Sequence, residues 1–150
     1  MKKYKEHRHI GVYGIVINEN EEILLIKKAV GPYKGKLDLP GGSFEFGERP
    51  CEVLKRELLE EVGIEVIDYT LITADSVLVD WHEKEDLFFK VHHTGIFYKI
   101  NEYKNEILYT VELDDKNDDS LGADFYKIKE LNNNNVSEIV MLILKHLKLK

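Results

Sequence analysis

The amino-acid sequence predicts one mixed α/β domain of the α+β kind, with helices packed on the faces of a mixed β-sheet. Two observations support this fold class. Apolar β-branched segments and segments with helical spacing follow one another in the order strands, helix, strands, helix. The chain has 150 residues, 43% of them hydrophobic and 33% charged, which is typical of a folded domain of ~100–200 residues. We therefore expect a single domain over residues 1–150.

The first strands are expected at residues 9–17 and 22–29, which are both rich in β-branched and apolar side chains. The polar residues 18–21 join them, which predicts a β-hairpin. Glycine and proline then occur seven times between residues 31 and 47. This density predicts a shaped loop between the hairpin and the next element.

A helix is predicted over residues 49–62. Pro50 suits the first helical turn, where its missing N–H has no partner to lose, and Gly63 suits the C-terminal cap. Apolar residues recur between these limits at spacings of three, four and four, and they form one stripe: Cys51, Leu54, Leu58 and Val62. This stripe is expected to face the core, with Cys51 as part of it.

The second half of the chain predicts more strands and a last helix. Strands are expected at 64–79 and 87–100 around a polar connection, with further short ones at 106–113 and 123–129. The C-terminal helix is expected at 136–148. Asn135 and Glu138 have the spacing of a capping box at its start, and an apolar stripe follows: Val136, Val140, Ile143 and Leu147.

Charge and composition exclude several classes of protein. The chain carries 28 acidic against 21 basic residues, a net charge of −7, which argues against a binder of nucleic acid polymers. No apolar run approaches the ~20 residues that span a bilayer, so no membrane partner is expected. Cys51 is the single cysteine, and the basic N-terminus lacks the apolar segment of a signal peptide. A cytoplasmic location is expected.

The predicted helix at 49–62 carries three carboxylates on one face, because residues three and four apart are neighbours on a helix. These residues are Glu57, Glu60 and Glu61. Acidic triplets on helices commonly form only a solvated face. The same side chains are also the hard oxygen ligands that Mg²⁺ and Mn²⁺ prefer. The surrounding spacing favours the metal site: Gly42, five residues, Glu48, seven residues, then the run Arg56–Ile64.

This 23-residue segment, Gly42–Ile64, resembles the signature box of the Nudix hydrolase family at every defining position. The approach Leu39–Gly42 and the segment Asp119–Phe125 are also similar to that family. The resemblance implies an α/β/α sandwich with a mixed sheet. It also implies an enzyme that hydrolyses the pyrophosphate bond of a nucleoside diphosphate linked to another group, with Mg²⁺ or Mn²⁺ as cofactor.

The resemblance implies a role for each residue of the box. Glu60 and Glu61 would bind the metal directly, and the Gly41 carbonyl would be a further ligand. Glu57 would be a ligand or the base that activates water. Two other residues would support these groups: Glu48 more distantly, and Arg56 by holding Glu57 through two parallel hydrogen bonds.

Residues outside the box supply further candidates. A further acidic ligand could come from Asp118, Asp119 or Asp124, with Asp119 placed best, although such loops are commonly only solvated turns.

The glycine-rich loop offers three candidates for contact with the phosphates or base of a substrate: Tyr33, Lys34 and Lys36. An ordinary surface loop is an equal alternative. Trp81 and His82 are more typical of packing than of substrate stacking. His92 and His93 alternate across a strand, so at most one of them faces any site.

Other functions on this fold are disfavoured. Isopentenyl diphosphate isomerase needs a catalytic cysteine, and Cys51 is wrongly placed for it. A non-hydrolytic nucleotide-binding module would lack one of the glutamates, and a decapping enzyme would carry a basic surface. The substrate class remains open between a nucleoside triphosphate, a modified triphosphate and a nucleotide sugar, since residues 79–82 match neither the ADP-ribose nor the diadenosine polyphosphate pattern. A homodimer is also left open.

Overall fold

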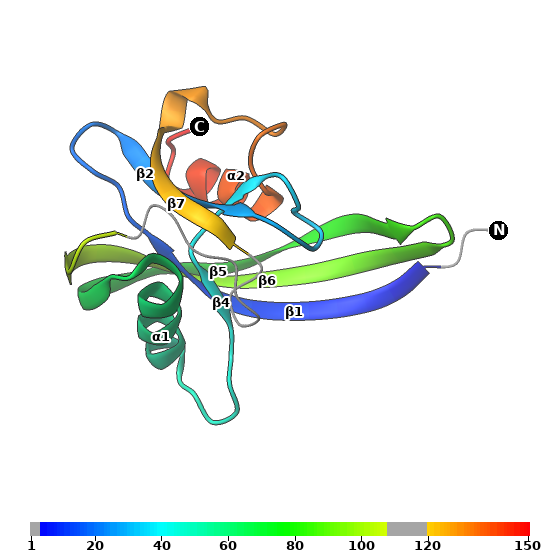
Figure 1. Cartoon of the computed structure of the whole chain (residues 1–150), viewed down its shortest axis with the longest axis horizontal. Coiled ribbons are helices and arrows are strands. Elements are labelled where there is room, and N and C mark those ends of the chain that lie inside the picture. The colour runs from blue at the N-terminus through cyan, green and yellow to red at the C-terminus, as the bar shows by residue number, and fades with distance from the viewer. Residues whose placement is uncertain (1–3, 108–119) are drawn as a thin grey trace.

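A computed structural model describes residues 4–107 and 120–150 of the chain, apart from the side chains of residues 120 and 121 (Figure 1). Its elements in chain order are β1 (Tyr4–Ile15), β2 (Glu22–Lys28), β3 (Leu37–Asp38), β4 (Gly41–Ser43), α1 (Pro50–Val62), β5 (Glu65–Lys84), β6 (Leu87–Lys104), β7 (Ser120–Lys127), the 3₁₀-helix η1 (Ile128–Glu130) and α2 (Glu138–His146). Among these elements, no helix is long and apolar enough to cross a membrane.

The strands form two sheets. A four-stranded sheet has the order β4-β1-β6-β5, in which β1 and β6 are parallel and the other pairs are antiparallel. A three-stranded antiparallel sheet has the order β3-β2-β7. The mixed sheet and the two helices confirm the predicted α+β class.

The predicted hairpin is only partly present. Its turn closes as expected, because the Asn18 side-chain oxygen accepts hydrogen bonds from the Asn20 and Glu22 backbone N–H groups. Beyond an isolated bridge between Ile17 and Ile23, however, β1 and β2 separate into different sheets. β2 and the second half of β1, residues 11–15, are buried on both faces. Their apolar runs therefore indicated central strands and did not identify their neighbours.

The core consists of two main clusters, one under each helix, with the sheets between them. In β2, Leu24 and Ile26 belong to the α1 cluster, whereas Ile23 and Leu25 belong to the α2 cluster. Successive side chains of a strand point to opposite faces, so β2 has a helix on each side. The α/β/α layering implied by the sequence resemblance is therefore confirmed.

Helix α1 matches its predicted limits. Arg49 caps its start, where the Glu52 carboxylate accepts a hydrogen bond from the Arg49 N–H. Gly63 ends it in a left-handed conformation with φ of 79°. Val53, Leu54, Leu58 and Val62 are fully buried. Cys51 is only half-buried, so the expectation that it belongs to the core was wrong, and Val53 takes that place.

Helix α2 is shorter than the predicted 136–148, and its predicted capping box is absent. The helix begins after Ser137 and ends at His146. Leu37 donates to the Asn135 carbonyl and Ser137 donates to the Leu37 carbonyl, so these residues extend along β3. The Asn135 side chain caps its own loop by accepting from the Asn132 N–H. Tertiary strand pairing thus displaces the first helical turn that the apolar spacing predicts.

Strands β5 and β6 extend further than predicted, to a tight turn at Glu85 and Asp86. Together with the first half of β1 they project from the body as a three-stranded arm (Figure 1). We define the arm as residues 4–10, 77–84 and 87–94. Of the strand predicted at 123–129, residues 123–127 belong to β7, whereas residues 128 and 129 lie in η1. The strand predicted at 106–113 falls outside the described residues from residue 108 onward.

Candidate active site

The candidate site lies where α1 meets β4. Gly41 and Gly42 of β4 pair with Tyr13 and Val12 of β1, and α1 packs against both β1 and β4. The approach of α1 to β1 is close, since a Cβ at Gly14 would come within 2.7 Å of Leu58 Cδ2. With its apolar stripe held in this way, α1 directs its carboxylates toward the glycines of β4.

Glu61 is the carboxylate that faces inward. Its side chain is only 8% exposed although it is ionisable. Its Oε1 accepts a hydrogen bond of 2.9 Å from the Gly41 N–H. We call Gly41 and Gly42, at the start of β4, the glycine turn. A buried carboxylate needs such partners, so the glycine turn and Glu61 fix each other's position.

Glu57 lies directly against Gly42. A Cβ on Gly42 would come within 2.5 Å of the Glu57 carboxyl carbon and within 2.6 and 2.7 Å of its oxygens. No side chain other than hydrogen fits between the two at this spacing. The glycine is therefore required by the approach of the carboxylate rather than by the local turn.

Arg56 connects the carboxylates of the box. Its Nε and Nη2 donate to the two oxygens of Glu48, both at 2.8 Å. Its Nη1 donates to Glu57 at 2.9 Å and to Glu60 at 3.4 Å, and Nη2 also reaches the Ser43 carbonyl at 2.9 Å. The expected pair of parallel bonds to Glu57 was therefore wrong, because the fork of the guanidinium engages Glu48 and leaves one bond for Glu57.

These contacts favour the charged forms of Glu48 and Arg56. The hydrogen bond from Arg56, followed by the Glu45 backbone N–H, lowers the pKa of Glu48 to about 2. The pKa of Arg56 is raised, chiefly by its hydrogen bond to Glu48. The side chains of Arg56, Glu48 and Glu57 are between 16 and 20% exposed, whereas that of Glu60 is 51% exposed. Of Glu48, Glu57 and Glu60, Glu60 is thus the most open to solvent.

The donor set suits a hard divalent cation, although it is not gathered around one point. Among residues 4–107 and 120–150, no three or more His, Cys, Asp or Glu side chains are grouped as a metal site would group them. Glu57 and Glu60 instead contact Arg56, and Glu61 contacts Gly41. All the side-chain donors on this face of α1 are nevertheless carboxylate oxygens, which Mg²⁺ and Mn²⁺ prefer. The chemistry of the residues fits the metal.

A buried polar network lies behind the glycine turn. The Tyr13 and Tyr33 hydroxyls contact the two ring nitrogens of His93, at 2.6 and 2.7 Å. Burial, with smaller contributions from His9 and Lys28, lowers the pKa of His93 to about 3. The imidazole is therefore neutral, and one tyrosine donates to it while the other accepts.

A second buried pair continues this interior. Ser137 donates to Asp38 at 2.7 Å, and the Leu39 N–H donates to the same carboxyl oxygen at 2.9 Å. Burial raises the pKa of Asp38. Sequence reasoning did not identify Tyr13, Asp38 or Ser137, since no local spacing connects residues that are far apart along the chain.

The candidates outside the box are dispersed. Tyr33 is 5% exposed and bonded to His93, so it lies inside the protein. Lys34 is exposed, and Lys36 is 3.9 Å from Glu138 of α2. Asp124 is exposed and caps the Phe125 N–H.

Two further groups of candidates remain. Asp118 and Asp119 lie outside the described residues. Trp81 stacks on Phe89 in the arm, with 5.3 Å between ring centroids, and His82 stacks on Phe88 at 4.2 Å.

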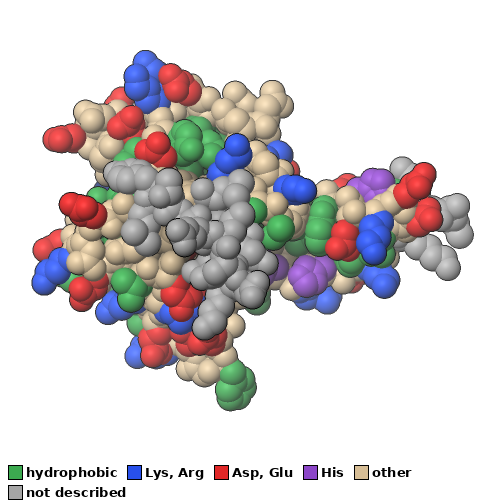
Figure 2. All heavy atoms as spheres, in the orientation of Figure 1, with side chains coloured by type: hydrophobic (Ala, Val, Ile, Leu, Met, Phe, Trp, Pro, Cys, Tyr) green, Lys and Arg blue, Asp and Glu red, His purple; other side chains and the backbone are tan. Residues whose placement is uncertain are grey.

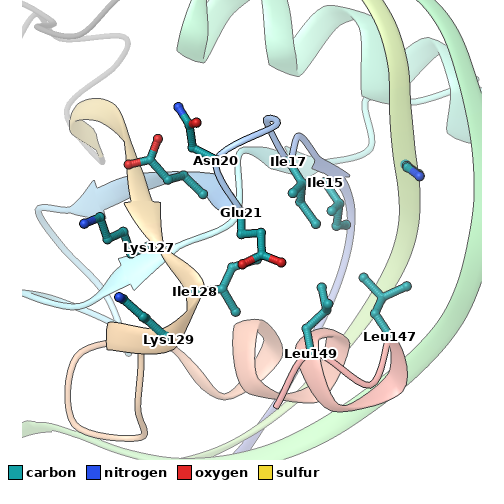
Figure 3. A pocket seen from close by; sticks show the side chains of 11 residues that line it. Ile15, Ile17, Asn20, Glu21, Lys127, Ile128, Lys129, Leu147 and Leu149 are labelled. Atoms are coloured by element: carbon teal, nitrogen blue, oxygen red, sulfur yellow. The ribbon is translucent and has the colours of Figure 1, made fainter.

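A pocket of about 840 Å³ opens elsewhere, between the β1–β2 turn, η1 and the end of α2 (Figure 3). Ile15, Ile128 and Leu147 line it together with Lys127 and Lys129. It includes none of the residues that the sequence predicts for the site. This pocket is thus separate from the carboxylates of α1.

Comparison with known proteins gives consistent relatives. Residues 7–141 match a family described as the NUDIX domain. The 8-oxo-dGTP diphosphatase of Proteus vulgaris is 31% identical over 104 residues, which cover 69% of this chain and 84% of that protein. The ADP-ribose pyrophosphatase of Methanocaldococcus jannaschii is 44% identical over 66 residues, which cover 43% of this chain and 38% of that protein.

Solved structures share the fold. The MutT NUDIX hydrolase from Burkholderia pseudomallei superposes with a TM-score of 0.71 at 22% identity, covering 94% of this chain and 98% of that one. A MutT protein from Bacillus halodurans superposes with a TM-score of 0.65 at 24% identity, covering 93% of this chain and 81% of that one. Because the domain match spans most of the chain and includes the whole carboxylate helix, this chain belongs to the Nudix hydrolase family of pyrophosphohydrolases.

Proposed function

We propose that this chain hydrolyses a pyrophosphate bond in a modified nucleoside triphosphate, with Mg²⁺ or Mn²⁺ as cofactor and water as the nucleophile. One observation supports this most strongly. Glu61 lies against Gly41, Glu57 lies against Gly42, and Arg56 holds Glu57, so a set of oxygen donors is positioned by backbone contacts as well as by side chains. Nudix hydrolases generally use divalent metals, which agrees with this donor set.

The proposed ligands are Glu57, Glu60, Glu61 and the Gly41 carbonyl, with Asp119 as a further ligand. A bound divalent cation neutralises phosphate oxygens and lowers the pKa of bound water. The chain's own residues position these groups. Glu61 is anchored by the Gly41 N–H, Glu57 is confined between Gly42 and Arg56, and Glu48 holds the guanidinium in place. Glu57 serves as a ligand or as the base that takes a proton from water.

The proposed substrate class follows the relatives with the widest match. The Proteus vulgaris protein, which matches 69% of this chain, is named an 8-oxo-dGTP diphosphatase. The ADP-ribose pyrophosphatase matches 43%. Lys34 and Lys36 are the loop cations proposed to contact the phosphates, whereas the buried Tyr33 is better suited to supporting the loop. A nucleotide sugar is the alternative substrate, and binding without hydrolysis is the alternative function.

A nucleotide panel tests the proposal. Purified chain would be incubated with Mg²⁺ or Mn²⁺ and with 8-oxo-dGTP, dGTP, ADP-ribose or a nucleotide sugar, and the products separated by ion exchange. We expect 8-oxo-dGTP to give the highest kcat/KM and chelation by EDTA to stop turnover. Nucleotide binding without cleavage of any member would instead identify a non-hydrolytic module.

The reaction in ¹⁸O-labelled water tests the nucleophile. Serine or cysteine attack would need a neighbouring base, and the Ser43 hydroxyl lies 3.3 Å from His9 Nδ1, which is a long hydrogen bond. We therefore expect one label in a phosphate product after a single turnover. Phosphate products without label would contradict attack by water at phosphorus.

A further inference from the structure

The arm leaves part of β1 with an open edge. Along its length β1 pairs with β6, from Tyr4 to Ile15, whereas on its other side β4 pairs only with Gly11–Tyr13. Among the described strands, none covers residues 4–10 on the side away from β6. These residues are exposed, apart from a half-buried His9. An open strand edge presents unpaired backbone groups to another strand.

The direction of these backbone groups follows from the neighbouring pairs. Gly14 donates its N–H to the Pro40 carbonyl, on the β4 side of β1. Backbone groups of a strand alternate in direction, and the β1–β6 register has no bulge. Glu6 and Arg8 therefore turn their N–H and C=O groups toward the open edge, and their side chains share one face of the arm with Tyr4 and Ile10.

The side chains of residues 4–10 are complementary to the same residues of a second copy that runs in the opposite direction. If a second copy pairs antiparallel about His7, Glu6 lies opposite Arg8 of the other copy, and Tyr4 lies opposite Ile10. Opposite charges facing each other across strands stabilise the pair, and like charges destabilise it. The charged face of the arm is visible in Figure 2.

Other registers lack this complementarity. Moving the centre by one residue places Glu6 opposite Glu6, or Arg8 opposite Arg8. A parallel in-register pairing also sets each charge against itself. The two-fold axis of such an antiparallel dimer is perpendicular to the sheet, so side chains that face one another across the two copies must lie on the same face of the sheet. The axis therefore passes through a residue position and not between two residues. The charges therefore select one antiparallel register.

The other edge of the arm is less suited to pairing. Within the arm, β5 has one register shift against β6, at His82/Lys84, whereas β1 has none. Bulges disrupt an edge as a template for another strand. The arm also extends away from the body (Figure 1), so antiparallel pairing places the two bodies at opposite ends.

We propose that a second copy of this chain binds along residues 4–10 of β1, in antiparallel register centred on His7. The resulting dimer has a continuous sheet in the order β5-β6-β1-β1-β6-β5. The paired edge ends where β4 begins, so the interface is continuous with the strand that carries the glycine turn of the site. This inference does not depend on the proposed substrate or metal.

Sedimentation equilibrium over a range of protein concentrations tests the dimer. We expect the wild type to approach twice the monomer mass. Glu6→Arg and Arg8→Glu should each raise the dissociation constant about tenfold or more, because each creates two like-charged pairs in the dimer. The double variant Glu6→Arg/Arg8→Glu should restore dimerisation. Asp80→Lys, on the same face but at the β5 edge, should leave it unchanged.

A cross-linking experiment tests the register. In a Cys51→Ala background, His7→Cys should form a disulfide between copies under mild oxidation, since facing residues in a non-hydrogen-bonded pair have Cα atoms about 4.5 Å apart. Arg8→Cys should not, because it faces Glu6. A monomeric wild type, a Glu6→Arg variant that dimerises normally, or loss of the dimer in Asp80→Lys would overturn the proposal. Thermal melting of each variant would confirm that the monomer is folded.

Discussion

Two polar clusters lie on either side of the glycine turn, and they differ in whether their side chains carry charge. The Arg56 cluster, comprising Arg56, Glu48, Glu57 and Glu60, lies at the solvent edge of α1, and its contacts favour the charged forms of Arg56 and Glu48. The His93 cluster, comprising His93, Tyr13 and Tyr33, is buried beneath the turn and is neutral. Both consist of titratable side chains joined by short hydrogen bonds.

The difference follows from burial. A guanidinium next to several carboxylates at the surface stabilises their charged forms, so the pKa of Glu48 is held low. Burial of an imidazole between phenols disfavours its cation, so the pKa of His93 is also low, and the group is uncharged. The first cluster contains carboxylates that are proposed to bind the metal. The second can only hold strands and loop together. Variants in the first should change activity, and variants in the second should change stability.

The largest effect is expected for Glu61→Gln. A neutral amide is a weaker metal ligand than a carboxylate, so we expect kcat to fall roughly 100- to 1000-fold. The amide oxygen can still accept the Gly41 N–H, so Tm should change little. Glu65→Gln, an exposed residue of β5, is the matched control. Wild-type turnover in Glu61→Gln would remove this carboxylate from the proposed site.

His93→Leu should have the opposite signature. It removes the His93 contact of both buried tyrosine hydroxyls, of which Tyr13 still has His9 at 3.3 Å. This costs about 2–3 kcal/mol of unfolding free energy. We expect kcat below the melting temperature to stay close to wild type. His92 is the exposed neighbour on the other face of the strand, and His92→Leu should change neither the unfolding free energy nor kcat. Urea unfolding and turnover would be measured for each variant. A large loss of kcat in a folded His93→Leu variant would contradict the expectation that the His93 cluster affects stability alone.

Replacing each glycine of the turn sharpens the comparison. Gly42→Ala places a methyl group against the end of the Glu57 side chain, which can move. We expect kcat to fall roughly 10- to 100-fold through misplacement, with little loss of stability. Gly41→Ala instead meets the Val12 carbonyl of the backbone at φ of 148°, so it should lower Tm. Equal effects of the two variants on Tm would contradict this division.

Arg56→Lys tests the fork. Lysine keeps the charge but cannot make the paired bonds to Glu48, so we expect kcat to fall about tenfold. Glu48→Gln disrupts the same fork from its other end and should give a similar loss. The double variant should lose little more than either single one, because both residues act through one contact. Fully additive losses would show that they act separately.

The smallest effects concern acid stability. His93 binds protons in the unfolded chain below its ordinary pKa of 6.5 but in the folded chain only below about 3. Stability should therefore fall as pH decreases through that window, and His93→Gln should reduce the slope. Glu48 also lowers stability as the pH falls, between its ordinary pKa of 4.5 and its pKa of about 2 in the folded chain. Glu48→Gln should therefore reduce the pH dependence of stability only in that lower range. Urea midpoints across pH, with each variant compared to wild type, separate the two windows.

Local sequence was enough for the box helix and its face. Pro50 and Gly63 mark the ends of α1, and its apolar spacing places Leu54, Leu58 and Val62 in the core. The same spacing brings Glu57 next to Glu60 and Glu61 whatever the rest of the chain does. These features depend on contacts between residues within a few positions of each other, so the helix and its carboxylate face were predictable.

Contacts between distant residues were not predictable in this way. The start of α2 moved because residues 135–137 pair with Leu37, and β1 separated from β2 because each found other partners. The fork of Arg56 reaches Glu48 across the loop before the helix rather than its neighbour Glu57, since guanidinium geometry depends on where that loop lies.

The sequence by itself determined the family, the mixed α+β class, and a row of carboxylates on a helix that begins at a proline and ends at a glycine. Those properties follow from short-range spacing. Only the tertiary structure decided which carboxylate is buried against Gly41, which one touches Gly42, and that His93 joins two tyrosines from separate segments. Hydrogen bonds, burial and the resulting pKa values depend on what packs nearby, and residues far apart along the chain become neighbours only when it folds.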